Sequence, residues 1–268
     1  MIYITGSSGF IGRHLTQKLD DYDIPWKRLE RNIKNNGWLE LNIPIGSVCF
    51  HLAANNSLKS STFNPEVTII EAKNLACALL EMNFSKIIFS SSGVVYGSDS
   101  INAYQEKDKL STSTHPYLQA KLVVEKLLIE HGHLVVRLAN VYGGDMDKNN
   151  VLSDILKQLP NKKTLVLRDG SCIRDFVHVS DVIDGLVKLE RLNKNGVYNL
   201  GSGVGVSIYE LAKSVLELSG EGHRDVLSLQ QKKVMSSVIL DSSKLSVECN
   251  WKPKISLCDG IRELLVEQ

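Results

Sequence analysis

The stretch TGSSGFIG, which follows the apolar run MIYIT at the start of the chain, restricts the possible folds more than any other feature. Its glycines Gly6, Gly9 and Gly12 stand between a predicted strand and a predicted helix at 9–19. Glycine permits a tight turn and close approach of backbone N–H groups to a pyrophosphate, and the helix N-terminus adds unpaired donors and partial positive charge. We therefore expect a dinucleotide-binding turn; the alternative is a glycine turn without a ligand.

Short apolar runs and helical patterns alternate after this turn. Strands are expected at 26–30, 38–43, 47–54, 86–92 and 133–143, and helices at 65–82 and 116–131. Strands that alternate with helices imply parallel pairing with helices on both faces, and runs such as KIIFS suit a sheet that is covered on both sides. The predicted fold class is α/β, a Rossmann-type doubly wound parallel sheet with a smaller C-terminal lobe.

The pattern changes after residue 143, where the polar stretch GGDMDKNN precedes an expected helix at 151–159 and an expected strand at 164–170. We predict a dinucleotide-binding domain at 1–143, to which segments around 174–203 return. A smaller substrate-binding lobe is expected at 144–268, with a cleft between the two parts.

Composition excludes several classes of function. A net charge of +1 argues against nucleic acid as a partner, and no apolar run approaches the roughly 20 residues that span a bilayer. The first residues do not resemble a signal peptide. Five scattered cysteines without a C-x-x-C motif predict free thiols rather than a zinc site or disulfides, and a cytoplasmic location fits them.

Two Tyr-x-x-x-Lys pairs occur, Tyr117 with Lys121 and Tyr209 with Lys213. Spacing alone does not distinguish them, because eight tyrosines make one such pair expected nearly by chance. The first pair shares the face of a helix that begins at Pro116 and follows a serine-ended strand. The second lies on a helix with apolar residues at core spacing, so we interpret it as structural.

Proton exchange by Tyr117 near neutral pH requires its pKa to fall by about 3 units from the usual value near 10. An adjacent lysine ammonium and a cationic nicotinamide ring would both stabilise the phenolate and shift the pKa in that direction.

Polar residues at the ends of two predicted strands complete the candidate site. Ser90, Ser91 and Ser92 end the strand at 86–92, at the sheet edge where ligands of parallel sheets bind. Glu30 ends the second strand and could accept hydrogen bonds from the adenosine ribose, which favours NAD. Arg31 could instead bind a 2′-phosphate, which leaves NADP open.

Seven motifs occur in the order found in extended short-chain dehydrogenases/reductases: TGSSGFIG, HLAA, FSSSGVVYG, PYLQAK, RLANVYG, IRDFVHVSDV and YNLGSG. The chain resembles the NAD-dependent epimerase/dehydratase branch of that family, in particular the nucleotide-sugar 4-epimerases. The resemblance runs from residue 1 to about 265 and is strongest up to 205.

The resemblance implies roles for matching positions. Ser92, Tyr117 and Lys121 would be catalytic, with Tyr117 as acid/base and Lys121 holding the nicotinamide ribose. Ser92, Asn140 and Arg174 would contact the substrate, whereas the turn that contains Asp175 and His178 would be structural. The predicted cofactor-binding residues are Gly6, Gly9, Phe10, Ile11, Gly12, Glu30, Arg31, Leu52, Ala53, Ala54, Ser90, Tyr117 and Lys121.

Two departures from the family pattern argue against one reaction type and change one expected substrate contact. Gly93 and Val94 stand where sugar-nucleotide dehydratases carry an Asp-Glu pair, so water elimination lacks its acid and base. An Arg-x-Gly-Asp motif is replaced by QQKKVM, where Lys232 or Lys233 would take over a phosphate contact.

Three functions follow from the resemblance: a C4 epimerase of a nucleotide sugar, an NAD(P)H-dependent reductase of a 4-keto-6-deoxy nucleotide sugar, or a catalytically silent dinucleotide sensor. A homodimer through the helices at 65–82 and 116–131 is also expected.

Overall fold

The structure, a computed structural model, describes residues 1–29, 42–53, 64–161, 163–230 and 236–266. The chain divides into two compact units. Unit 1 comprises Met1–Val95, Lys109–Arg137 and Ile183–Tyr198, and unit 2 comprises Tyr96–Asp108, Leu138–Val182 and Asn199–Gln268.

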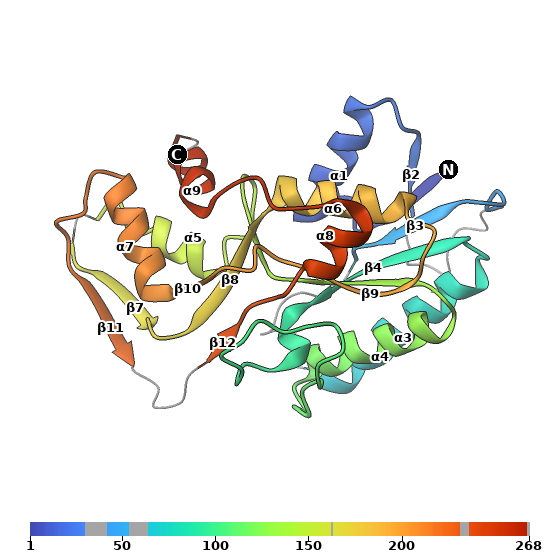
Figure 1. The fold of residues 1–268 in the computed structure, drawn as a ribbon, viewed down its shortest axis with the longest axis horizontal. Coiled ribbons are helices and arrows are strands. Elements are labelled where there is room, and N and C mark those ends of the chain that lie inside the picture. Colours follow the sequence, from blue (N-terminus) through green and yellow to red (C-terminus); the bar gives the residue numbers. More distant parts are fainter. Residues whose placement is uncertain (30–41, 54–63, 162, 231–235, 267–268) are drawn as a thin grey trace. The chain divides into compact units, whose positions relative to one another are not determined.

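A six-stranded sheet with the order β2-β1-β3-β4-β5-β9 organises unit 1 (Figure 1). Strand β1 pairs in parallel with β2 and β3, and β3 pairs in parallel with β4. The strands are β1 (Ile2–Thr5), β2 (Trp26–Arg28), β3 (Val48–His51), β4 (Lys86–Ser92), β5 (Leu134–Leu138) and β9 (Gly196–Leu200). The predicted Rossmann-type α/β class is confirmed.

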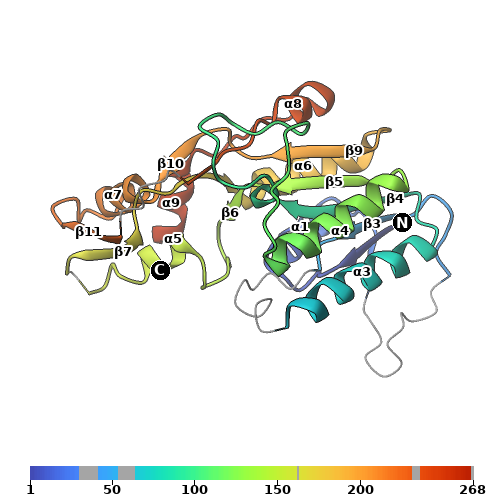
Figure 2. The ribbon, with the colours of Figure 1, turned by 90° about the horizontal axis from the view of Figure 1, so that it is seen from below.

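Helices cover both faces of this sheet (Figures 1 and 2). They are α1 (Phe10–Asp21), α3 (Pro65–Glu81), α4 (Pro116–Glu130) and α6 (Val179–Arg191). Helices α3 and α4 pack side by side on one face, where Leu79 and Leu128 join Phe89 of β4 in a buried core. The apolar strands are buried along their length because both faces are covered, as expected for β1 and β3.

The order of the strands in the sheet indicates where a ligand site is expected. The chain passes from β1 to β2 on one side and returns to β3 on the other side of β1, so the order reverses between β1 and β3. In open parallel sheets, ligands bind outside the carboxyl ends of the strands at this switch point. Gly6 and Leu52 directly follow these two strands.

Several expected elements differ from the structure or fall partly outside the described residues. The segment 133–143 forms two strands, because β5 pairs with β9 whereas β6 (Asn140–Tyr142) pairs with β8 (Ile173–His178). The helix expected at 151–159 ends at Leu156, shortly before Pro160, which disfavours helical backbone in the preceding residue. Of the strand expected at 38–43, residues 38–41 lie outside the described residues.

Unit 2 is built around β8, which pairs in parallel with β6 and β12 and antiparallel with β10. A separate parallel pair joins β7 and β11. The strands are β7 (Leu165–Asp169), β8 (Ile173–His178), β10 (Gly205–Ser207), β11 (Val226–Gln230) and β12 (Ser237–Val238). The helices are α5 (Val151–Leu156), α7 (Ile208–Leu218), α8 (Ser243–Cys249) and α9 (Leu257–Val266), and η1 (Gly93–Tyr96) is a 3-10 turn that leads out of β4.

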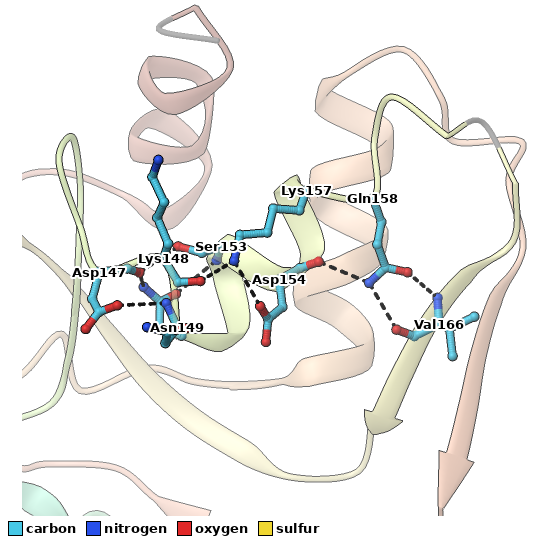
Figure 3. A network of polar contacts seen from close by, with 9 residues as sticks. Asp147, Lys148, Asn149, Ser153, Asp154, Lys157, Gln158 and Val166 are labelled. Carbon is cyan, nitrogen blue, oxygen red and sulfur yellow. Dashed lines mark hydrogen bonds and ion pairs between the residues drawn. The ribbon is translucent and has the colours of Figure 1, made fainter. Parts of the chain in front are cut away.

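The core of unit 2 brings α5, α7 and α9 together around residues such as Ile155, Leu211 and Ile261. Figure 3 shows how polar groups fix α5 beside β7. Asn150 caps α5 by accepting from the N–H of Ser153 at 3.0 Å. The Gln158 amide both donates to the carbonyl of Val166 and accepts from its N–H, as a neighbouring strand would.

Among the residues described, no helix has the length and apolar character needed to cross a membrane.

Candidate active site

The glycine turn between β1 and α1 has the geometry that a bound diphosphate requires. Gly6 has a φ of +70°, and a Cβ there would lie 2.6 Å from the backbone nitrogen of Ala53. A Cβ on Gly12 would lie 2.1 Å from the carbonyl oxygen of Gly6, so only glycine lets α1 pack this closely on the turn. Gly9 begins the helix without a side-chain cap, which leaves the helix N-terminus bare toward a ligand.

A cavity of about 430 Å³ in unit 1 extends from this turn to α4. Of the predicted cofactor residues, Gly6, Gly9, Leu52, Ala53, Tyr117 and Lys121 line it. The glycine turn, the strand ends and Lys121 fit a nicotinamide dinucleotide, because the backbone can bind the diphosphate and the ammonium can bind ribose hydroxyls.

The other predicted cofactor residues lie apart from the cavity lining. Phe10 and Ile11 are half-buried in the first turn of α1, where Phe10 packs edge-on against His14. Ser90 donates through its hydroxyl to the carbonyl of His51 at 3.4 Å. Glu30, Arg31 and Ala54 lie outside the described residues, and so do Lys232 and Lys233.

The sequence analysis missed several cavity residues, four of them on α3. Thr68, Glu71, Ala72 and Leu75 line the cavity, together with Ser8, His51, Phe89, Ala120 and Val124. The α3 residues recur at i, i+3, i+4 and i+7, which places them on one helix face. That spacing is visible in the sequence, but it does not show which face meets a ligand.

Ser92 and Tyr117 meet across 25 residues of chain, at the carboxyl end of β4 and the first turn of α4. The Ser92 side chain lies close enough to the Tyr117 phenol to lower its pKa. His115 caps α4 by accepting from the N–H of Tyr117 at 3.3 Å, and Pro116 occupies the first helical turn as expected. This cap holds Tyr117 at the start of the helix.

Lys121 lies one turn further along α4 and is 5% exposed. Its Nζ donates to the carbonyl of Ser90 at 2.7 Å and lies 4.8 Å from the ring centroid of Phe89 and 5.8 Å from that of Tyr117. The structure thus brings the three predicted catalytic residues near one another, and two of them, Tyr117 and Lys121, line the cavity.

Burial dominates the electrostatics of these groups. It raises the pKa of Tyr117, and the Ser92 hydrogen bond lowers it in part. The downward shift that we expect from Lys121 and a bound nicotinamide cation therefore acts against burial. Burial also lowers the pKa of Lys121 to about 8, opposed by the charge of Glu125, and lowers the pKa of His51 to about 3, helped by the Lys121 charge.

The predicted substrate contacts Asn140 and Arg174 belong to unit 2. Asn140 is exposed and donates to the carbonyl of Asp175 at 3.3 Å. The Arg174 guanidinium donates to the carbonyls of Ile173 and Ser236 at 2.7 and 2.9 Å. Their roles toward a substrate stay predictions.

Asp175 and His178 have the kind of contacts expected of structural residues. Asp175 is fully buried and accepts from Ser202, Gly203 and Leu240. His178 is buried and its Nε2 lies 3.3 Å from a carboxylate oxygen of Glu263.

The second Tyr-x-x-x-Lys pair has a different environment. Tyr209 is 42% exposed, and Lys213 donates to the carbonyl of Arg224 at 3.1 Å. Leu211 and Val215 of the same helix are fully buried in the core of unit 2. These contacts agree with the structural interpretation of this pair.

Known proteins resemble this chain over nearly its whole length. A UDP-glucose 4-epimerase of Halalkalibacterium halodurans is 25% identical over 303 residues, which cover 94% of this chain and 90% of the relative. A GDP-6-deoxy-D-mannose reductase of Pseudomonas aeruginosa is 27% identical over 299 residues, covering 98% and 95%. The fold matches the structure of RMD from P. aeruginosa complexed with NADPH at a TM-score of 0.86, with 24% identity and 99% and 97% coverage.

The family resemblance expected from the ordered motifs is confirmed by a sequence model of the NAD dependent epimerase/dehydratase family, which matches residues 2–201. The dinucleotide cofactor predicted from the glycine turn is the cofactor of that family. The chain therefore belongs to the NAD dependent epimerase/dehydratase family.

Proposed function

We propose that this protein is an NAD-dependent epimerase that inverts C4 of a nucleotide-activated sugar. The closeness of Ser92 to Tyr117, with the Lys121 ammonium 5.8 Å from the Tyr117 ring centroid, carries the proposal. Tyr117 and Lys121 line the same cavity as the glycine turn. The relatives named UDP-glucose 4-epimerase support a sugar nucleotide as the substrate.

In this proposal Tyr117 takes the proton of the C4 hydroxyl and later returns it. The Ser92 hydroxyl holds the same sugar oxygen, and its hydrogen bond lowers the pKa of Tyr117 against the effect of burial. The dinucleotide, when bound, supplies hydride acceptance and donation at C4. Lys121 binds the ribose and stabilises the phenolate by its charge. The resulting 4-ketose rotates before reduction, which inverts the centre.

A 4-keto reductase is the second candidate, because a GDP-6-deoxy-D-mannose reductase is 27% identical over 98% of the chain. The same three residues would then donate a proton to a ketone oxygen. Gly93 and Val94 follow Ser92 and carry no acid or base, so a dehydratase remains disfavoured.

The experiment separates the two by the fate of the cofactor. An epimerase regenerates NAD in each cycle, whereas a reductase exchanges it. The purified protein is denatured and the released dinucleotide identified, and intact protein is incubated with UDP-, dTDP-, GDP- and CDP-sugars without added cofactor. We expect bound NAD(H) and interconversion of one sugar with its C4 epimer. Protein that is empty, leaves every 4-hydroxy sugar unchanged and oxidises NADPH only with a 4-keto sugar would refute the epimerase and support the reductase.

We also propose a cytoplasmic homodimer, which rests on the free cysteines and on the apolar residues of α3 and α4. Exposed Val67 and Ile70 on α3 suit such an interface. Light scattering during size-exclusion chromatography should give twice the chain mass; the mass of one chain at micromolar concentration would refute the dimer.

A further inference from the structure

A buried ion pair lies directly behind the proposed catalytic lysine. Glu125 of α4 is 2% exposed and follows Lys121 by four residues, and Arg137 of β5 is 3% exposed. Neither is among the described residues that line the cavity. The pair therefore has no direct contact with a ligand in that cavity.

Both carboxylate oxygens of Glu125 accept hydrogen bonds. Arg137 donates from Nε to both carboxylate oxygens at 3.2 Å and from Nη2 to Oε2 at 2.7 Å. Ser91 donates to Oε1 at 2.5 Å. Charge-assisted bonds of this kind are short and strong, so they fix the position of a buried side chain.

Two adjacent residues of β4 connect this pair to Lys121. Ser90 accepts the Lys121 ammonium through its carbonyl, and Ser91 donates to Glu125 through its hydroxyl. Successive turns of α4 are thus bonded to successive residues of β4. The Glu125 charge raises the pKa of Lys121 against the burial that lowers it.

The other groups near Lys121 leave Glu125 as its main source of negative charge. His51 of β3 is neutral at physiological pH, since burial lowers its pKa to about 3. Tyr117 of α4 is a neutral phenol, because burial raises its pKa. Glu71 of α3 lines the same cavity but is exposed to solvent, which screens its charge.

We propose that Glu125 is a positioning residue whose buried charge keeps the Lys121 side chain in its ammonium form and directed toward the cavity. Arg137 would balance that charge from the far side. The inference rests on the role proposed for Lys121. Stability alone does not explain the pair, because buried ion pairs are often no more stabilising than apolar side chains of similar volume.

The test measures the pKa of Lys121 directly in the free protein. The side-chain nitrogen shifts of isotope-labelled lysine are followed by NMR from pH 6 to 11, and Lys121→Arg assigns the signal. Glu125→Gln removes the negative charge at nearly constant shape, and Arg137→Gln removes the positive charge and breaks the same contacts.

A charge effect predicts opposite results for these two variants, whereas a packing effect predicts similar ones. We expect the Lys121 pKa to fall by about one pH unit in Glu125→Gln and to rise in Arg137→Gln. The pH at which NAD affinity is halved should move in the same directions. Shifts in one common direction, or no shift in either variant, would overturn the inference.

If Glu125→Gln does not fold, the double variant Glu125→Gln/Arg137→Gln replaces it in the test. The double variant leaves no buried charge without its partner, so it should fold more readily. Glu125 is the charged group that raises the pKa of Lys121, so this pKa should be lower in the double variant than in the wild type. An unchanged value would refute the proposal. No sugar or dinucleotide is needed, so failure of the epimerase assay leaves this result independent.

Discussion

Replacing Gly6 by alanine should weaken both folding and dinucleotide binding. The residue has a φ of +70°, and left-handed backbone costs a non-glycine residue roughly 1–2 kcal/mol. The added Cβ would also lie 2.6 Å from the nitrogen and 2.8 Å from the Cα of Ala53. These are backbone atoms that cannot rotate away, so overpacking should add about 1–3 kcal/mol. We expect a total loss of about 2–5 kcal/mol in the free energy of unfolding.

Gly46→Ala is the matched control. Gly46 has a φ of +82°, and nothing lies within 4 Å of the position of its Cβ. This variant should therefore lose only the roughly 1–2 kcal/mol of left-handed strain. Urea unfolding of the free protein gives both losses, and titration calorimetry gives the NAD dissociation constants. Gly6→Ala should bind NAD at least about tenfold more weakly, while Gly46→Ala binds as the wild type. Equal losses of stability and unchanged binding in both variants would refute the role of close backbone contact.

Three further predictions concern pH and packing. The Lys121 side chain, with a pKa of about 8, is charged below that pH and neutral above it. NAD affinity should therefore fall as the pH rises through about 8. A Lys121→Met variant with the same pH dependence of NAD affinity would contradict this. The pKa of His51 is lowered to about 3 by burial, so between about 3 and 6.5 only the unfolded state is protonated. The free energy of unfolding, measured in urea, should therefore decrease as the pH is lowered from about 6.5 to about 3, by up to about 1.4 kcal/mol per pH unit. His51→Asn should remove most of this pH dependence. An unchanged slope in the variant would contradict the prediction. Leu211→Ala opens a cavity in the core of unit 2 and should cost about 2–5 kcal/mol of unfolding free energy; a loss below 1 kcal/mol would show that the core collapses around it.

The sequence predicted the parts of the fold in which local chemistry decides the structure. The run KIIFSSS forms β4 with the expected bounds, because its apolar residues are buried between helices on both faces. The glycine turn could be predicted equally well, because the positive φ at Gly6 and the close backbone contact at Gly12 both require glycine. The break between β5 and β6 was missed because it depends on pairing with two different strands, β9 and β8, that lie far along the chain.

The candidate site could be predicted only in part, because it too depends on contacts between residues that are far apart in the chain. The order of motifs suggested that Ser92 and Tyr117 meet, but the burial that raises the Tyr117 pKa depends on packing. Glu125 in the run VVEKLL looks like a residue of a solvated helix face. Its burial becomes apparent only when β5 places Arg137 beside it.

The central claim is that Tyr117, rather than the second tyrosine of the same spacing, moves the proton at C4. The most direct measurement compares turnover of the active nucleotide sugar by Tyr117→Phe and by Tyr209→Phe, with NAD affinity measured for both. We predict that Tyr117→Phe loses at least about a hundredfold in kcat with nearly unchanged NAD binding, and that Tyr209→Phe remains as active as the wild type. Activity that survives in Tyr117→Phe would contradict the account.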